Sequence, residues 1–160
     1  MAMHLSSALV DDGDWRGQLC PIDNAARVVG SRSTMLIVRE AFYGTTRFDD
    51  FVTYTRLTTA VVSSRLKNLL EARVLELQPY RDAGQRTRNE YVLTERGNAL
   101  LPMVLALMQW GSDYVLDGAP VRADDAATGH RLAVGPRDEE GSPLTSDRVA
   151  IVPNPAFAGS

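Results

Sequence analysis

The sequence predicts a mainly α-helical protein with one β-hairpin and a C-terminal appendage that is either a small β unit or partly disordered. Apolar residues recur at helical spacing along most of residues 21–115, and alternation replaces this spacing around residues 74–93. Beyond residue 117 the composition shifts to Gly, Pro, Asp and Arg. We therefore expect three parts: an N-terminal tail over 1–18 that is flexible or reaches a partner subunit, a folded domain over 19–116, and a C-terminal extension over 117–160.

Length and composition limit the class of protein. The 160 residues correspond to about one domain with appendages, and the formal net charge is -3. The single cysteine, Cys20, excludes an intrachain disulfide and a multi-cysteine zinc site, and neither His4 nor His130 has further ligands at metal-binding spacing. No segment reads as a signal peptide or as a membrane span. We expect a cytoplasmic protein with no membrane association, no metal and no cofactor.

The first three helices are expected ahead of a fourth, amphipathic helix. Pro21 suits a first helical position, and Gly30 ends that helix. Ser33 or Thr34 is expected to cap the second helix, which is largely apolar and therefore central. The third helix is short and has phenylalanines on one side and aspartates on the other, over the range Arg47 to Thr55.

The fourth helix, capped by Thr58, has one apolar and one polar face. Leucine and valine side chains recur at i, i+4, i+7 and i+8 and are expected to be buried: Val62, Leu66, Leu69 and Leu70. The opposite face carries short polar and basic side chains: Thr59, Ser63, Arg65, Lys67 and Asn68. Such a face is suited to contact with another molecule.

A β-hairpin and a long helix complete the domain. Residues alternate between apolar and polar on either side of a turn over Asp82 to Gln85, which predicts the hairpin. Thr94 then caps a helix from about Glu95 to Val115, which Pro102 is expected to kink. Apolar side chains surround this helix almost completely, and a domain of this size cannot bury them all. We expect a second copy of the chain to cover the excess.

This order of elements is that of a helix-turn-helix followed by a wing. The fourth helix would face the major groove of double-stranded DNA, where Arg65 suits guanine and Asn68 suits adenine. Residues 56–88 hold seven basic and three acidic side chains, so this segment is +4 and the remainder is -7. The predicted DNA-binding residues are Arg47, Thr58, Thr59, Ser63, Ser64, Arg65, Lys67, Asn68, Arg81, Arg86 and Arg88.

Several motifs together resemble those of a known family. They are a cysteine before the first helix, Gly44 followed by Arg47-Phe48-Asp49-Asp50-Phe51, Arg65-Leu66 with Leu69, and Tyr91-Val92-Leu93-Thr94-Glu95-Arg96-Gly97. The run from Cys20-Pro21 to Trp110-Gly111 resembles the HxlR-type winged helix-turn-helix family of bacterial transcriptional regulators.

The resemblance implies a homodimer on inverted-repeat DNA that represses or activates transcription, often in response to a small molecule or an oxidant. It implies dimerisation through the first and last helices, for which the candidate residues are Ile22, Leu101, Val104, Leu105 and Met108. Two features depart from the family pattern. Arg73 stands where a helix-ending glycine is usual, and Ala60 to Val62 make the start of the fourth helix less polar, which favours readout through methyl contacts or DNA shape.

Two further features each have two interpretations. Cys20 is either a sensor of oxidants or electrophiles, its thiolate favoured by the helix dipole, or a small buried apolar residue beside a dimer helix. Aromatic and sulfur-containing side chains either line an effector pocket between subunits or belong to the core: Phe42, Tyr43, Met103, Met108 and Trp110.

The alternative to DNA binding is a winged-helix protein-interaction module that no longer binds DNA. The acidic remainder of the chain and the apolar Val61-Val62 favour this alternative. An enzyme has no support, because the sequence lacks a glycine-rich phosphate loop and a Gly-x-Ser-x-Gly motif. The paired acids Asp11-Asp12 and Glu139-Glu140 lie in expected loops.

Overall fold

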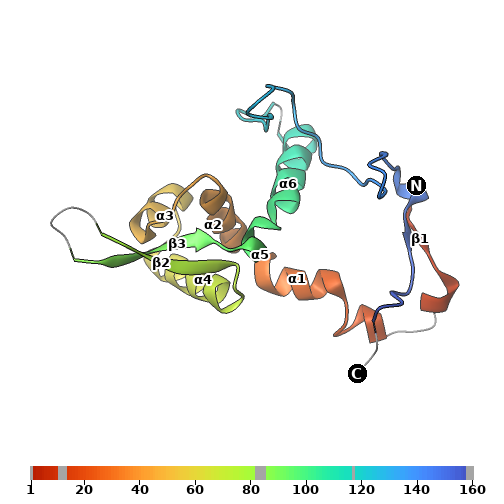
Figure 1. Ribbon diagram of the computed structural model, residues 1–160, viewed down its shortest axis with the longest axis horizontal. Coiled ribbons are helices and arrows are strands. Elements are labelled where there is room, and N and C mark those ends of the chain that lie inside the picture. The colour runs from red at the N-terminus through yellow and green to blue at the C-terminus, as the bar shows by residue number, and fades with distance from the viewer. Residues whose placement is uncertain (1, 11–13, 82–85, 117, 158–160) are drawn as a thin grey trace.

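The computed structural model describes residues 2–10, 14–81, 86–116 and 118–157 (Figure 1). Its α-helices are α1 (Pro21–Val29), α2 (Arg32–Phe42), α3 (Phe48–Thr55), α4 (Thr59–Glu71), α5 (Glu95–Asn98) and α6 (Leu101–Tyr114). Strands β2 (Leu75–Tyr80) and β3 (Arg88–Leu93) form an antiparallel hairpin, and the two-residue strands β1 (His4–Leu5) and β4 (Ala150–Ile151) pair in parallel. The predicted fold class, mainly helical with a hairpin wing, is confirmed.

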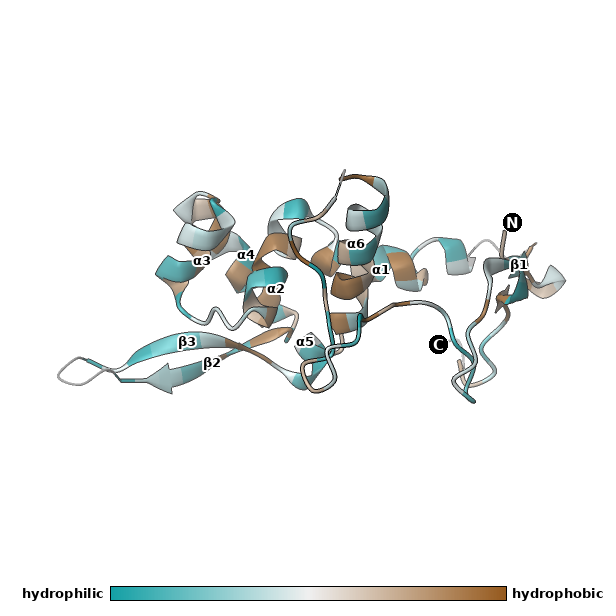
Figure 2. Ribbon diagram, turned by 90° about the horizontal axis from the view of Figure 1, so that it is seen from above, coloured by the Kyte–Doolittle hydropathy of each residue, from teal (hydrophilic) through white to brown (hydrophobic). Residues whose placement is uncertain are grey.

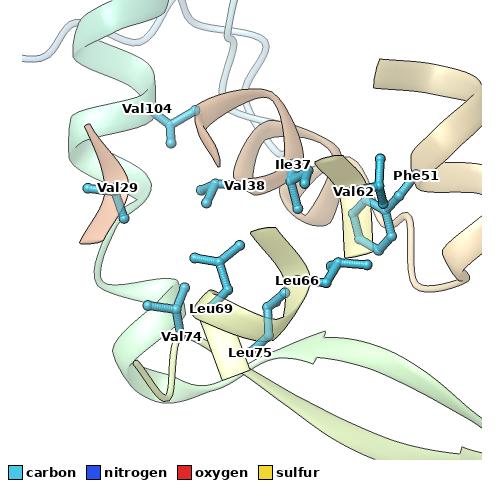
Figure 3. Packing of buried hydrophobic residues seen from close by; sticks show 10 residues of the cluster. All are labelled: Val29, Ile37, Val38, Phe51, Val62, Leu66, Leu69, Val74, Leu75 and Val104. Carbon is cyan, nitrogen blue, oxygen red and sulfur yellow. The ribbon is translucent and has the colours of Figure 1, made fainter. Parts of the chain in front are cut away.

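One hydrophobic core joins the helices to the base of the hairpin (Figure 3). Helix α2 lies at its centre, as its apolar sequence predicts, with Ile37 and Val38 fully buried. Phe51 of α3 is also fully buried, and its ring meets Tyr91 of β3 edge-on at 6.2 Å between centroids. The rest of the core comes from α1, α4, the start of the hairpin and α6: Val29, Val62, Leu66, Leu69, Val74, Leu75 and Val104.

The helix caps are mostly those that the sequence predicts. Thr58 accepts a hydrogen bond from the Val61 amide at 3.4 Å, and Thr94 accepts one from the Gly97 amide at 3.0 Å. The prediction for α2 was wrong, because its cap is Ser31 rather than Ser33 or Thr34. Ser31 has extended backbone angles, and its Oγ accepts from the Thr34 amide at 3.1 Å.

The final helix is broken in two rather than kinked. Helix α5 ends at Asn98 and α6 begins at Leu101, so Pro102 lies in the first turn of α6. A proline ring clashes with the carbonyl four residues earlier, here that of Asn98, and proline cannot donate the corresponding hydrogen bond. The predicted single helix from Glu95 to Val115 was therefore wrong, and its break lies one turn before the proline.

Helix α4 ends in a Schellman motif with Arg73 in the left-handed conformation, at φ +55°. The Arg73 amide donates to the Leu70 carbonyl and the Val74 amide to the Leu69 carbonyl, each at 2.9 Å. Leu69 and Val74 are buried, which completes the hydrophobic contact of this motif. The conformation explains why glycine is usual at this position of the family pattern.

Replacing Arg73 by glycine is expected to raise the free energy of unfolding by about 0.5–1 kcal/mol. A left-handed conformation costs a residue with a Cβ roughly 1–2 kcal/mol, which glycine avoids at some entropic cost. Urea denaturation measures the change. The matched control, Arg96→Gly inside α5, is expected to lower stability instead, by about 1 kcal/mol. A destabilised Arg73→Gly variant would show that the arginine side chain itself holds the end of α4.

The N-terminal segment and the C-terminal extension pair with each other. The His4 amide donates to the Val149 carbonyl and the Ser6 amide to the Ile151 carbonyl, each at 2.9 Å. Nearer the domain, the side-chain amide of Gln109 on α6 pairs with both the amide and the carbonyl of Val134. Arg131 of the extension also lies 3.4 Å from Asp113 of α6, so the described part of the extension is largely irregular, with short β pairings and more than one contact with α6.

Candidate nucleic-acid interface

Helices α3 and α4 form the helix-turn-helix, joined by a turn at Arg56 and Leu57. Arg56 adopts the left-handed conformation, at φ +56°, which lets the chain reverse between the two helices. The Thr55 hydroxyl donates to the Phe51 carbonyl at 2.6 Å and accepts from the Leu57 amide at 3.3 Å. The turn is therefore held by a buried threonine, and it fixes the angle at which α4 leaves α3.

Helix α4 buries Val62, Leu66 and Leu69 and turns its other side to solvent. Four of the five side chains predicted for the polar face are exposed, namely Thr59, Ser63, Lys67 and Asn68, and Ala60 and Ser64 are exposed beside them. Lys67 lies 3.8 Å from Glu71, and because both side chains are largely exposed this ion pair contributes little. The face thus offers short hydroxyls, an amide and an ammonium group without large apolar side chains.

Arg65, which was predicted on the polar face of α4, also contacts another helix. It is half-buried at the edge of α4, and its Nε donates to the Ser33 Oγ on α2 at 3.0 Å. The structure therefore brings Arg65 together with a serine that sequence reasoning considered only as a helix cap. The contact joins residues 32 positions apart, so no local pattern reveals it. It fastens α4 to the central helix.

The hairpin forms a wing that projects beyond the helices (Figure 1), and its outer part is hydrophilic (Figure 2). Arg81, Arg86 and Arg88 are exposed on it. The predicted turn over residues 82–85 lies outside the described residues. The three arginines place positive charge at the far end of the wing.

Several contacts fix the wing against the segment before α3. The Tyr91 amide donates to the Thr46 carbonyl at 2.8 Å, and the Thr46 hydroxyl donates to Glu90 Oε2 at 2.7 Å. The guanidinium of Arg47, which precedes α3, lies 4.6 Å from the centre of the Tyr80 ring, a cation–π contact. Arg47 is thus positioned between the helix-turn-helix and the wing.

The predicted dimer residues lie in different environments. Val104 is only 7% exposed and belongs to the protomer's own core, which leaves it little surface for a partner subunit. Leu105 and Met108 are half-buried beside the extension, whereas Ile22 on α1 and Leu101 on α6 are exposed by 79% and 42%.

Sequence reasoning missed an exposed apolar stripe on α6. Leu107, Trp110 and Tyr114 are 51%, 59% and 78% exposed, and the last two rings lie 6.2 Å apart. Apolar residues occur on every side of this helix, so the sequence alone does not show which of them form an exposed stripe. The structure reveals it, because Val104 faces the core whereas Leu107 at its edge, Trp110 and Tyr114 keep most of their side-chain surface in solvent.

Cys20 is the N-cap residue of α1 and is half-buried. Its carbonyl accepts hydrogen bonds from the Asn24 amide at 3.0 Å and from the Asn24 side chain at 2.9 Å. Within the described ranges, no three His, Cys, Asp or Glu side chains lie close enough together to hold a metal ion.

A sequence profile described as HxlR-like helix-turn-helix matches residues 28–118, which is more than half of the chain. The chain belongs to the HxlR-like helix-turn-helix family. The match covers the helix-turn-helix, the wing and α6, and the resemblance seen in the sequence motifs is confirmed.

Relatives of this HxlR-like protein are named as transcriptional regulators. Rv3095 of Mycobacterium tuberculosis, an HTH-type transcriptional regulator, is 33% identical over 141 residues, covering 85% of this chain and 87% of that protein. The crystal structure of PA1607, a candidate transcription factor, has a TM-score of 0.72 at 36% identity and covers 84% of this chain and 96% of that one. The redox regulator HypR in its reduced form has a TM-score of 0.51 at 25% identity and covers 57% and 89%.

The family and these relatives show that the chain is a DNA-binding transcriptional regulator and not an enzyme. Along the described ranges, no helix is long and apolar enough to cross a membrane. The match to Rv3095 covers about 136 of the 160 residues, so it continues at least about 18 residues beyond the end of the family profile at residue 118. The extension is therefore shared with this relative in part.

Proposed function

We propose that this regulator binds inverted-repeat operator DNA as a homodimer, with α4 in the major groove and the wing against the phosphate backbone. The observation that carries the proposal is the exposed polar face of α4, which lies in a segment of net charge +4 within a chain of net charge -3. Such a concentration of positive charge is the electrostatic signature of a DNA-reading surface.

The proposed interface residues fall into three groups: those that contact bases, those that contact phosphates, and Arg65, which positions α4. Ser63, Ser64 and Asn68 lie on the exposed face of α4 and are proposed to contact base edges, with Asn68 suited to adenine. Phosphates are proposed to bind to the cap and first turn of α4, to the basic side chains beside it and to the wing: Arg47, Thr58, Thr59, Lys67, Arg81, Arg86 and Arg88. Arg65 is proposed to position α4 through Ser33 and to retain a contact with DNA at the helix edge.

The dimer is proposed to form through α1 and the exposed stripe of α6. Ile22, Leu101, Leu107, Trp110 and Tyr114 are all more than 40% exposed. Exposed apolar patches of this kind mark interaction surfaces, and a two-fold dimer buries the same surface on each copy. Leu105 and Met108 lie beside the extension and are proposed to contribute at the edge of this interface.

Selection of the full-length protein on random duplex DNA tests this function. We expect enrichment of an inverted repeat whose half-sites lie about one helical turn apart. Asn68→Ala is expected to reduce discrimination at one base pair of each half-site by about 1–3 kcal/mol. The control Asn98→Ala, an exposed asparagine on α5, leaves it unchanged. Failure to enrich any motif would rule out sequence-specific binding by this chain.

A further inference from the structure

A cavity of about 390 Å³ lies between α2, α6 and the first residues of the extension. Its walls are mostly apolar and include Met35, Leu36, Val104, Leu107, Leu116 and Val121. Arg39 and Tyr43 supply polar groups to the lining, with the guanidinium 5.9 Å from the centre of the tyrosine ring. A cavity of this size, with mostly apolar walls and few polar groups, has the properties of a small-molecule site.

Gly111 points to an occupant of this cavity. It lies within α6 and lines the cavity, and apart from its chain neighbours and the backbone of its own helix nothing lies within 4 Å of the position that a Cβ would take. A glycine inside a helix costs about 1 kcal/mol relative to alanine. No neighbour in the described protomer requires the missing side chain, so the glycine keeps space open for a group from outside the protomer.

The arrangement of the walls favours a small molecule over a second copy of the chain. Three segments of the same protomer line the pocket, and the extension forms one of its walls. A helix with its side chains is about 10 Å wide and needs an open surface rather than a space bounded on three sides. The centre of the dimer surface proposed above, moreover, lies on Leu107, Trp110 and Tyr114 of α6, and only Leu107 of these and Met108 at its edge also line the cavity.

We propose that this cavity binds a small aromatic compound with one hydrogen-bonding oxygen. The ring would lie among Met35, Met108 and Leu107, because thioether sulfur makes favourable contacts with aromatic rings. The oxygen would be directed towards Tyr43 and Arg39. Arg39 also binds the buried carboxylate of Glu40 through Nε and Nη2, so a molecule with a single weakly charged or neutral oxygen suits the site better than a multiply charged anion.

The position of the cavity gives the bound compound a regulatory effect. Helix α2 is joined to α4 by the Ser33–Arg65 hydrogen bond, whereas α6 carries the proposed dimer surface. A molecule between α2 and α6 therefore changes how the DNA-reading helix sits relative to the partner subunit. This regulatory part rests on the proposed function, whereas occupancy of the cavity does not.

Methyl NMR of the full-length protein tests occupancy. The protein is labelled with [¹³C-methyl]methionine and titrated with 2-naphthol, and the Met35 signal is assigned with Met35→Leu. We expect saturable shifts of the Met35 and Met108 methyl signals, with the signal of the distant Met3 unchanged. Absence of a saturable Met35 shift up to millimolar 2-naphthol, or equal shifts of Met3 and Met35, would overturn the proposal.

Substitutions that place a side chain in the cavity provide a second test of binding. Gly111→Leu is expected to weaken 2-naphthol binding at least tenfold, and the smaller Gly111→Ala, which also favours the helix, is expected to weaken it less. Gly135→Leu is the control, because this glycine also has open space at its Cβ position but lies outside the cavity. Wild-type affinity in both Gly111 variants would overturn the proposal.

Measurements of DNA affinity test the regulatory part of the proposal separately from occupancy of the cavity. Saturating 2-naphthol is expected to change the affinity of the wild type for its selected operator and to leave that of Gly111→Leu unchanged. An unchanged wild-type affinity would overturn the regulatory part, while the methyl shifts still decide whether the cavity is a binding site. Failure to bind DNA at all would contradict the proposed function and leave the methyl result standing.

Discussion

Replacing Ser63 by glutamate is expected to lower the affinity for the selected operator at least about 100-fold. Ser63 is exposed in the middle of α4, so the variant retains the buried face that holds the helix in place. A carboxylate there would face phosphates and the acceptor groups of base edges, and like charges brought together at an interface cost several kcal/mol. Fluorescence anisotropy with the labelled operator measures the affinity.

The same substitution at Ser142 is the control. Ser142 is exposed in the extension, and Ser142→Glu changes the net charge of the protein equally. We expect its DNA affinity to stay within about twofold of the wild type, because exposed charges separated by more than about 10 Å are largely screened. Equal losses in the two variants would show that net charge, rather than contact through α4, governs binding.

Replacing Phe51 by alanine is expected to lower the free energy of unfolding by about 3–5 kcal/mol. Phe51 is fully buried, and removing a buried phenylalanine costs its transfer free energy and leaves a cavity. The ring also meets Tyr91 edge-on, and the Tyr91 amide joins β3 to Thr46, so the loss reaches the base of the wing. Urea denaturation followed by circular dichroism measures the change.

Phe157 provides the matched control. It is 58% exposed near the end of the described extension, and Phe157→Ala is expected to change stability by less than about 0.5 kcal/mol. A similar loss in both variants would mean that Phe157 is buried in solution by another part of the protein or by a second copy.

The fold was predictable because local signals agree along the domain. The leucine spacing of α4, the caps at Thr58 and Thr94 and the alternation in the hairpin each depend on residues close in sequence, and the structure has all of them. The exposed face of α4 follows from the same periodicity, since burying Val62, Leu66 and Leu69 leaves the opposite residues in solvent.

The features that the sequence did not show depend on contacts between residues distant in sequence, or on which of several similar side chains packs inward. Arg65 reaches Ser33 on another helix, and no spacing rule predicts which polar group a long side chain will meet. Val104 is as apolar as Leu107, so only the packing of α6 on α2 decides which of them is buried. The pairing of β1 with β4 joins residues near the two ends of the chain, so no local pattern predicts which segment each strand pairs with.

The salt dependence of operator binding tests most directly whether the wing contacts the same DNA as α4. Each lost phosphate contact lowers the slope of log K against log salt by about 0.9, so Arg81→Ala/Arg86→Ala/Arg88→Ala is expected to make the slope shallower by about 2–3. The control Arg122→Ala/Arg131→Ala/Arg137→Ala removes the same charge from the extension, and we expect it to retain the wild-type slope. Equal slopes for all three proteins would contradict the account of the wing as a DNA-contacting element.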